Sequence, residues 1–259
     1  MEKNKKMKSF ICDKLTVKIN DTRTEMGKCA ASDIRAKMKE LLSAKNEINM
    51  IFAAAPSQND VLSELIKYED IPWERVNVFH MDEYIGLLEC DREKSFSTYL
   101  KEHIFEKVTF KSVNLIDACA SDPEEECRRY SELLKKYPTD IVVMGIGENG
   151  HIAFNDPPVA DFCDPMMVKR VTLDEVCRNQ QVNDGCFPEI GRVPKEAMTL
   201  TCPTLFAADH LFCIVPAPTK AEAVYKTVNG KISEACPATV LRKHDSAILY
   251  LDNDSSRLL

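Results

Sequence analysis

A histidine and an aspartate lie five residues apart in a glycine-rich loop that follows an apolar run. The run covers residues 140–146, and residues 145–157 read GIGENGHIAFNDP. Glycines allow a backbone to approach a ligand closely, so the loop is suited to presenting His151 to a substrate. Asp156 is placed to orient the imidazole. The alternative interpretation is a structural histidine in a tight turn.

Residues 145–150 also match the GxGxxG fingerprint of dinucleotide-binding proteins. That fingerprint requires a helix to begin inside the motif, because the helix N-terminus holds the pyrophosphate. Pro157 and Pro158 follow closely and exclude a long helix. The loop therefore does not predict NAD or FAD binding, and we expect no cofactor.

Two adjacent carboxylates, Asp82 and Glu83, follow a second apolar run at residues 75–81. Carboxylates at a strand end are costly if they are buried without partners. Partial burial would also raise a carboxyl pKa and suit the group to general base catalysis. Asp82 is therefore a candidate base. The alternative is a helix N-cap followed by a solvated acid.

Two further segments have the composition of an anion site. Ser57, Gln58 and Asn59 lie between a predicted strand and a predicted helix. Hydroxyl, amide and free backbone N–H groups at such a position can hold an anion, although a plain N-cap is the more common explanation. Lys220 falls in the first turn of another predicted helix, where a cation opposes the macrodipole unless it serves an anion. A solvated lysine is the alternative.

Composition excludes several classes of protein. The chain has 259 residues, 44% of them hydrophobic, with 34 Lys+Arg against 41 Asp+Glu and a net charge of −7. This composition predicts a globular chain with a core and argues against a nucleic-acid partner. No run approaches the ~18 apolar residues that a membrane helix needs. The polar residues 1–10 argue against a signal peptide.

The spacing of the cysteines and histidines argues against disulfides and against a metal site. The 11 cysteines include no CxxC pair, and the 5 histidines are far apart. This pattern predicts reduced thiols in a cytoplasmic protein and no metal site.

An alternation of strands and helices must position these residues. It predicts a single α/β domain over residues 1–259, with a doubly wound, mostly parallel, Rossmann-like sheet and helices on both faces. The expected strands are 47–55, 75–81, 140–146, 167–172, 197–201, 211–215 and 247–252, and the expected helices are 30–45, 59–67, 95–106, 123–136 and 219–228. Ligands of such sheets bind beyond the carboxyl ends of the strands. We therefore expect the ligand-binding residues just after Ala55, Met81, Ile146 and Val215.

Taken together, these segments resemble the glucosamine-6-phosphate deaminase/isomerase family. The match is specific at residues 81–87, which read MDEYIGL, and at 145–157 with its GHIAFN core. It is weaker at residues 193–199 and around Lys220, and it extends from about residue 30 to the C-terminus. The resemblance implies a sugar-phosphate isomerase domain that converts glucosamine 6-phosphate and water to fructose 6-phosphate and ammonia.

The resemblance also implies individual roles. His151 would open the sugar ring by moving a proton to and from the ring oxygen, and Asp82 would carry a proton from C2 to C1. Asp156 stands where the family has a glutamate that orients the histidine, and Lys220 matches a phosphate-binding lysine. Asn149 stands where one branch has an aspartate, and we group it with the catalytic residues.

Several positions depart from the family pattern. The phosphate loop commonly carries paired glycines followed by Ser or Thr, whereas this chain has Ser57, Gln58 and Asn59. We group these three, with Gly150 and Lys220, as substrate-binding residues. An arginine that assists the phosphate has no clear match in residues 178–183; Arg178 and Arg192 are candidates for its role. Ala217 stands where a glycine is usual.

Two alternative functions stay open at this stage. A 6-phosphogluconolactonase shares the Gly-His loop but needs no base at C2, so the retention of residues 82–84 argues against it. A non-catalytic sugar-phosphate-binding protein would explain the altered phosphate loop. The expected partner in every case is a small sugar phosphate. The sequence does not distinguish gluco from galacto substrates, and a homo-oligomer is compatible with it.

Overall fold

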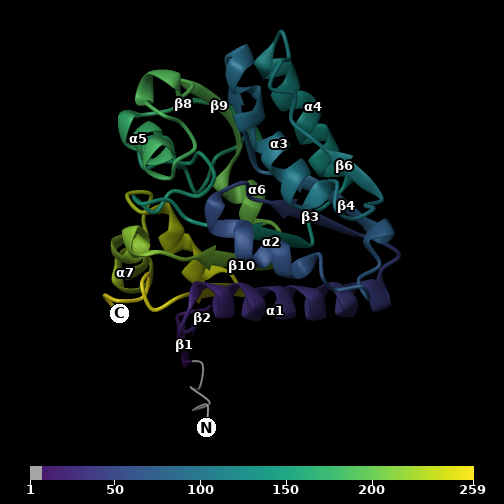
Figure 1. Ribbon diagram of the computed structural model, residues 1–259, viewed down its shortest axis with the longest axis vertical. Coiled ribbons are helices and arrows are strands. Elements are labelled where there is room, and N and C mark those ends of the chain that lie inside the picture. The colour runs from purple at the N-terminus through teal and green to yellow at the C-terminus, as the bar shows by residue number, and fades with distance from the viewer. Residues whose placement is uncertain (1–7) are drawn as a thin grey trace.

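The computed structural model describes residues 8–259 (Figure 1). The signal-peptide prediction rests on residues 1–10, and residues 1–7 of these lie outside the described part. Within residues 8–259, no helix has the length and apolar character needed to cross a membrane.

An eight-stranded sheet forms the centre of the molecule, in the order β1-β2-β11-β10-β7-β3-β4-β6. Its strands are β1 (Lys8–Cys12), β2 (Leu15–Ile19), β3 (Ile48–Phe52), β4 (Val76–His80), β6 (Ser112–Asn114), β7 (Ile141–Met144), β10 (His210–Val215) and β11 (Ala247–Leu251). Every neighbouring pair is parallel except the β1–β2 hairpin at one edge. The predicted doubly wound, mostly parallel sheet is therefore confirmed.

The strand order reverses at the β3–β7 boundary. After β3, the chain adds β4 and β6 on one side; it then returns through β7 and adds β10 and β11 on the other. Such a reversal separates the loops that leave the two central strands and opens a crevice at their carboxyl ends.

A second, three-stranded sheet differs from the expectation. It is antiparallel, with β9 (Glu196–Leu200) between β5 (Asp82–Ile85) and β8 (Val168–Thr172). Strands were predicted near 167–172 and 197–201, but as members of the large sheet. A strand pattern contains no information about which distant strand will pair with it, so the separate sheet was not visible in the sequence.

Seven α-helices cover these sheets in the described part of the chain. They are α1 (Arg23–Ala44), α2 (Asn59–Leu65), α3 (Phe96–Leu100), α4 (Pro123–Lys136), α5 (Glu175–Asn183), α6 (Cys202–Phe206) and α7 (Ala221–Asn229). Helix α4 has the predicted bounds, and α1 begins seven residues earlier than predicted. Thr22 and Glu25 form a capping box that satisfies free N–H groups at the start of α1.

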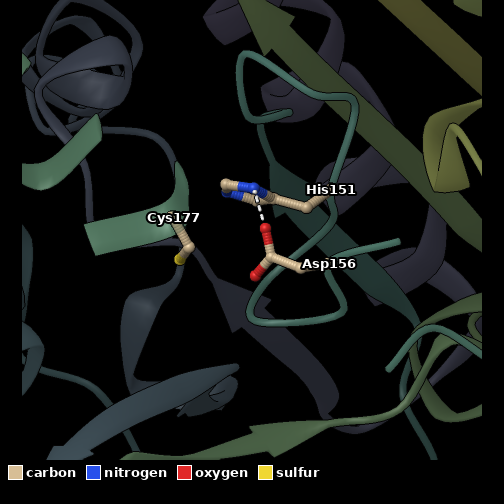
Figure 2. Close-up of side chains that lie close together, drawn as sticks. All are labelled: His151, Asp156 and Cys177. Atoms are coloured by element: carbon tan, nitrogen blue, oxygen red, sulfur yellow. Dashed lines mark ion pairs between the residues drawn. The ribbon is translucent and has the colours of Figure 1, made fainter. Parts of the chain in front are cut away.

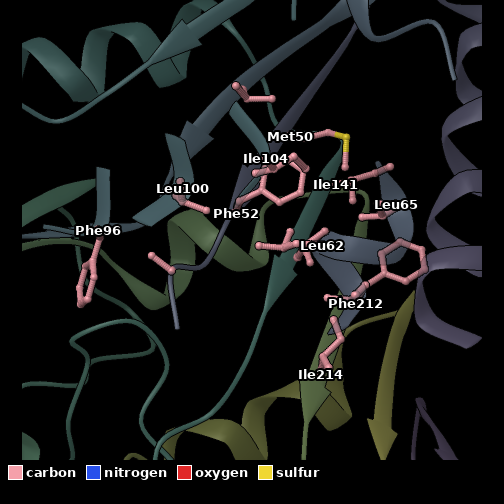
Figure 3. Close-up of a cluster of buried hydrophobic side chains, with 14 of the residues drawn as sticks. Met50, Phe52, Leu62, Leu65, Phe96, Leu100, Ile104, Ile141, Phe212 and Ile214 are labelled. Carbon is pink, nitrogen blue, oxygen red and sulfur yellow. The ribbon is translucent and has the colours of Figure 1, made fainter. Parts of the chain in front are cut away.

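Two hydrophobic clusters fill the space on the two faces of the large sheet. Successive residues of one strand point to opposite faces, so Phe52 belongs to one cluster and Ile51 to the other. Figure 3 shows the first cluster, in which Leu62 and Leu65 of α2 pack with residues of β3, β7 and β10. Tyr130 of α4 belongs to the second cluster. Burying each large side chain stabilises the fold by roughly 1.5–3 kcal/mol.

Candidate active site

A cavity lies at the carboxyl ends of β3, β4, β7 and β10, where the strand order reverses. Ala55, Met81, Ile146 and Pro216 line it, and each follows one of these strands. This is the edge of the sheet at which the sequence predicts a ligand. Four candidate side chains from four different segments meet in the lining: Ser57, Asp82, His151 and Lys220.

His151 is held from behind by Asp156. Its Nδ1 atom lies 2.9 Å from Oδ1 of Asp156. A dashed line marks this contact in Figure 2. The Asn149 side-chain N–H donates to the same carboxylate oxygen at 2.8 Å, and the Asn149 side-chain oxygen Oδ1 accepts from the His151 backbone N–H at 2.9 Å. Asp156 and Asn149 do not line the cavity. They therefore orient the imidazole and leave its Nε2 atom available to a ligand.

The pKa of Asp156 reflects two opposed effects. Burial alone would raise it, but the charge of His151 and hydrogen bonds from His151, Asn149 and Cys177 hold the pKa below its usual value. Asp156 is therefore ionised at neutral pH. An ionised carboxylate stabilises the imidazolium that forms when His151 takes a proton.

The glycines of the loop have different structural tasks. A Cβ atom at Gly147 would lie 2.4 Å from Nε2 of His151, so the ring packs directly over this residue. Gly150 has a φ of +83°, and a Cβ there would lie 2.4 Å from the Cys236 sulfur. Gly150 is absent from the cavity lining. It shapes the turn before His151, whereas the sequence predicts that it binds substrate.

Cys177 of α5 completes this group. The ligand atoms of His151, Asp156 and Cys177 all lie within 4.8 Å of one another, and all three side chains are buried. Burial and the charge of Asp156 raise the pKa of the thiol far above its usual value. The thiol is thus protonated and donates to Asp156. A metal would need the thiolate and the nitrogen that Asp156 already holds, so these residues fit a hydrogen-bonded group better than a metal centre.

The two adjacent carboxylates have separate environments because β5 turns them to opposite faces. Glu83 accepts backbone N–H groups from Tyr84, Phe96 and Ser97 at 2.9–3.1 Å and so fixes the start of α3. Asp82 lines the cavity and is only 8% exposed. Asp82 lies within a strand, so the helix N-cap interpretation is wrong.

Asp82 has the environment of a base. Burial, and then the charge of Glu83, raise the pKa of Asp82 well above its ordinary value. No hydrogen bond to its carboxylate is formed by any residue of the described chain. Its oxygens are therefore available to take a proton from a bound molecule.

Lys220 supplies a cation to the same cavity. It is 6% exposed, and its ammonium has neither a hydrogen bond nor an ion pair within residues 8–259. Burial lowers the pKa of Lys220, while the charges of Asp184 and Glu148 act in the opposite direction. A buried ammonium without a partner favours an anionic ligand. The solvated-lysine interpretation does not explain the burial of Lys220.

The loop after β3 places one of its three predicted residues in the cavity. Ser57 lines it. Gln58 is fully buried and donates to the Ile214 carbonyl at 3.3 Å and to the Ser57 hydroxyl at 3.0 Å. Asn59 accepts a hydrogen bond from the Tyr99 hydroxyl outside the lining. Gln58 and Asn59 therefore shape the loop, and the prediction that their side chains bind substrate is not supported by their position.

Helix α5 and its C-cap residue, Asp184, contribute residues that sequence reasoning missed. Gln180, Gln181 and Asp184 line the cavity. Gln180 accepts from the Glu148 backbone at 2.9 Å, and Gln181 accepts from the Tyr84 hydroxyl at 2.7 Å. The α5 N-cap, Asp174, was the available signal. The inward residues of α5 are largely polar, however, so no apolar stripe marks the helix.

The two arginines proposed for the phosphate lie elsewhere. Arg178 donates to the carbonyls of Ile190 and Val193, and Arg192 forms an ion pair with Asp91 at 2.7 Å. Neither lines the cavity, but Arg23 does. Arg23 lies far from the other site residues in the sequence, and no motif pointed to it.

Comparison with known proteins identifies the family of this chain. The family model described as "Glucosamine-6-phosphate isomerases/6-phosphogluconolactonase" matches residues 21–250. A glucosamine-6-phosphate deaminase of Listeria monocytogenes serotype 4a is 33% identical over 237 residues, which cover 91% of this chain and 98% of that protein. One of Clostridium acetobutylicum is 31% identical over 247 residues, which cover 94% and 99%.

Solved structures give the same result. A monomeric glucosamine-6-phosphate deaminase superposes with a TM-score of 0.83 at 30% identity, covering 94% of this chain and 99% of that one. A 6-phosphogluconolactonase from Thermotoga maritima gives 0.74 at 18% identity, covering 92% and 100%, and shows a shared fold. By its sequence, fold and matched length, this chain belongs to the glucosamine-6-phosphate isomerase/6-phosphogluconolactonase family.

Proposed function

We propose that this protein is an amino-sugar-phosphate deaminase that converts glucosamine 6-phosphate and water to fructose 6-phosphate and ammonia. The observation that carries this proposal is the position of Asp82. A buried, unpartnered carboxylate lines the same cavity as His151 and the buried ammonium of Lys220. An aldose–ketose conversion needs a base beside C1 and C2, an acid and base for ring opening, and an anion site for the phosphate.

The reaction begins with ring opening. His151, oriented by Asp156, takes the proton from the C1 hydroxyl and returns one to the ring oxygen, which gives the open-chain aldehyde. Asp82 then removes the C2 proton, and the ammonium group of the substrate gives a proton to the carbonyl oxygen, which forms an enolamine. Asp82 returns its proton to C1, which leaves an imine at C2. Water adds to the imine, and ammonia leaves as the ketone forms. Lys220 and Ser57 hold the phosphate.

The lactonase alternative uses less of the site. Hydrolysis of 6-phosphogluconolactone requires no base at C2, so it gives no task to the Asp82 carboxylate. The deaminase proposal accounts for Asp82, His151 and Lys220 together. It also includes a cytoplasmic location, which is supported by the free state of all 11 cysteines.

The test measures ammonia release from the purified protein with glucosamine 6-phosphate, with galactosamine 6-phosphate in parallel. We expect release from at least one substrate. Asp82→Asn should abolish turnover and keep ligand affinity within about tenfold, because it removes a group that acts mainly in the transition state.

Three outcomes would overturn the proposal. Ammonia release from neither hexosamine 6-phosphate would reject it. Rapid hydrolysis of the lactone without isomerisation would assign the lactonase activity instead. Stabilisation of the fold by a sugar phosphate without any turnover would indicate a binding protein.

A further inference from the structure

The part of the cavity around Lys220 and Ser57 has too little positive charge to balance the negative charge of a phosphate. Lys220 is its buried cation, and the charges of Asp184 and Glu148 act on it. A phosphate monoester has a charge of about −1.5 to −2 at neutral pH. One partly compensated ammonium leaves most of that charge unbalanced. A second cation in the lining would complete the site.

Arg23 is that second cation. It is the first residue of α1, and it lines the cavity together with Pro56 and Ser57. Its Nε atom donates to Asp60 at 2.6 Å, and its Nη2 atom donates to the Pro56 carbonyl. Its Nη1 atom has no hydrogen-bond partner in the described part of the chain. The guanidinium is therefore anchored along one edge, while both N–H groups of Nη1 stay free.

Close packing of α1 on α2 creates this anchor. Gly27 lies one turn after Arg23, on the same face of α1. A Cβ atom at Gly27 would lie 2.5 Å from Cβ of Asp60. Only a glycine lets the helices approach this closely, and the approach brings the Asp60 carboxylate to Arg23. Asp60 neutralises part of the arginine charge, but the ion pair also holds the planar guanidinium in one orientation.

We propose that Arg23 is a substrate-binding residue that donates from Nη1 to the anionic group of the sugar phosphate, which Lys220 and Ser57 also hold. The inference rests on the proposed function and adds a specificity determinant to it. Arg23 favours a phosphorylated sugar over the corresponding neutral sugar.

The experiment compares Arg23→Gln with Arg35→Gln. Arg35 lies on the same helix and pairs with Asp70 at the surface, outside the cavity lining. We expect Arg23→Gln to raise KM for glucosamine 6-phosphate by roughly 10- to 100-fold with kcat within about threefold, the effect of losing a hydrogen bond to a charged group. The inhibition constant of inorganic phosphate should rise with it. Arg35→Gln should change neither value by more than about twofold.

A second pair of variants guards against misfolding. Arg23→Lys keeps the charge but loses the planar guanidinium and its N–H donors, so it should raise KM severalfold. Arg35→Lys should leave KM unchanged. The inference is overturned if both Arg23 variants keep the KM of their Arg35 controls while the wild type releases ammonia. If the wild type releases none, calorimetry with inorganic phosphate decides: weaker binding by Arg23→Gln than by Arg35→Gln supports the anion site, and equal binding rejects it.

Discussion

The Nδ1 atom of His151 lies 2.9 Å from Oδ1 of Asp156, and this contact fixes which ring nitrogen can serve a substrate. The Asp156 carboxylate contacts Nδ1 of His151, so Nε2 is the nitrogen that can exchange a proton with a substrate. In the proposed reaction this pair carries out ring opening, and Asp82 carries out the transfer between C2 and C1.

Replacing His151 by glutamine should therefore affect one step selectively. We expect kcat/KM to fall by about 10²- to 10⁴-fold on the closed-ring sugar, because a positioned acid and base is lost. The fall on an open-chain analogue should be much smaller. Parallel assays on the two substrates provide the measurement. Equal losses on both would show that ring opening is not the task of His151.

The thiol of Cys177 should influence the pH dependence of this pair. Its hydrogen bond is one of the contacts that lower the pKa of Asp156. A folded-state pKa below the unfolded value adds stability above the unfolded pKa, and this stability is lost as the pH falls through the folded value. Cys177→Ala should therefore shift the acid loss of both activity and stability to higher pH, whereas Cys177→Ser should keep the donor and the wild-type profile.

Cys213→Ala is the matched control for Cys177→Ala. Cys213 is also a fully buried thiol, and burial is the sole cause of its raised pKa. Its replacement should lower stability by a similar packing cost at every pH. If Cys177→Ala also lowers stability uniformly, with no displacement of the profile, the thiol has only a packing role.

The carboxylate of Asp82 should reduce stability at neutral and alkaline pH. Its folded-state pKa lies well above the unfolded value. As the pH rises between these two values, the unfolded chain has already lost the proton that the folded protein retains, so the free energy of unfolding decreases. Asp82→Asn should thus be more stable than the wild type at pH 8, and the difference should vanish below about pH 4.

Urea unfolding across this pH range measures the effect of Asp82→Asn. Asp254→Asn, at an exposed position, is the control and should follow the wild-type curve. A constant offset between Asp82→Asn and the wild type at all pH values would contradict the assignment of a raised pKa to this group.

Ala217 should respond favourably to a glycine. Its φ of 84° and ψ of 148° lie in a region that is essentially restricted to glycine and costs other residues about 1–3 kcal/mol. Glycine loses more entropy on folding, so we expect Ala217→Gly to raise stability by about 1 kcal/mol and Tm by about 2–4 °C. Ala223→Gly, inside α7, should lower it by a similar amount. A lower Tm for Ala217→Gly would contradict the strain.

The sequence pattern predicted five of the eight strands of the large sheet, namely β3, β4, β7, β10 and β11, and missed β1, β2 and β6. Residues 141–144 are apolar throughout, as expected for a strand buried on both faces, and Asp122 with Pro123 marked the start of α4. These signals are local. The position of the cavity followed from them, because parallel strands align their carboxyl ends at one edge.

The remaining features depend on contacts between distant residues. Helix α5 turns Gln180 and Gln181 inward, so hydrophobic periodicity does not reveal it. Cys177 reaches Asp156, and Arg23 reaches Pro56, only after the chain has folded. For the same reason, the side-chain directions of Gln58 and Asn59 could not be inferred from their types.

The division into two sheets has a consequence for the proposed chemistry. Asp82 is mounted on β5 of the small sheet, whereas His151 and Lys220 follow β7 and β10 of the large one. Three hydrogen bonds near the cavity connect these parts. They run from the Leu200 backbone to the Met81 carbonyl, from the Phe154 backbone to the Thr199 hydroxyl, and from the Asn155 side-chain amide to the Leu200 carbonyl. The proposed base and the proposed ring-opening group are therefore aligned by the contact between the two sheets. Substitutions at this contact would change the rate of turnover, while binding of the phosphate would persist.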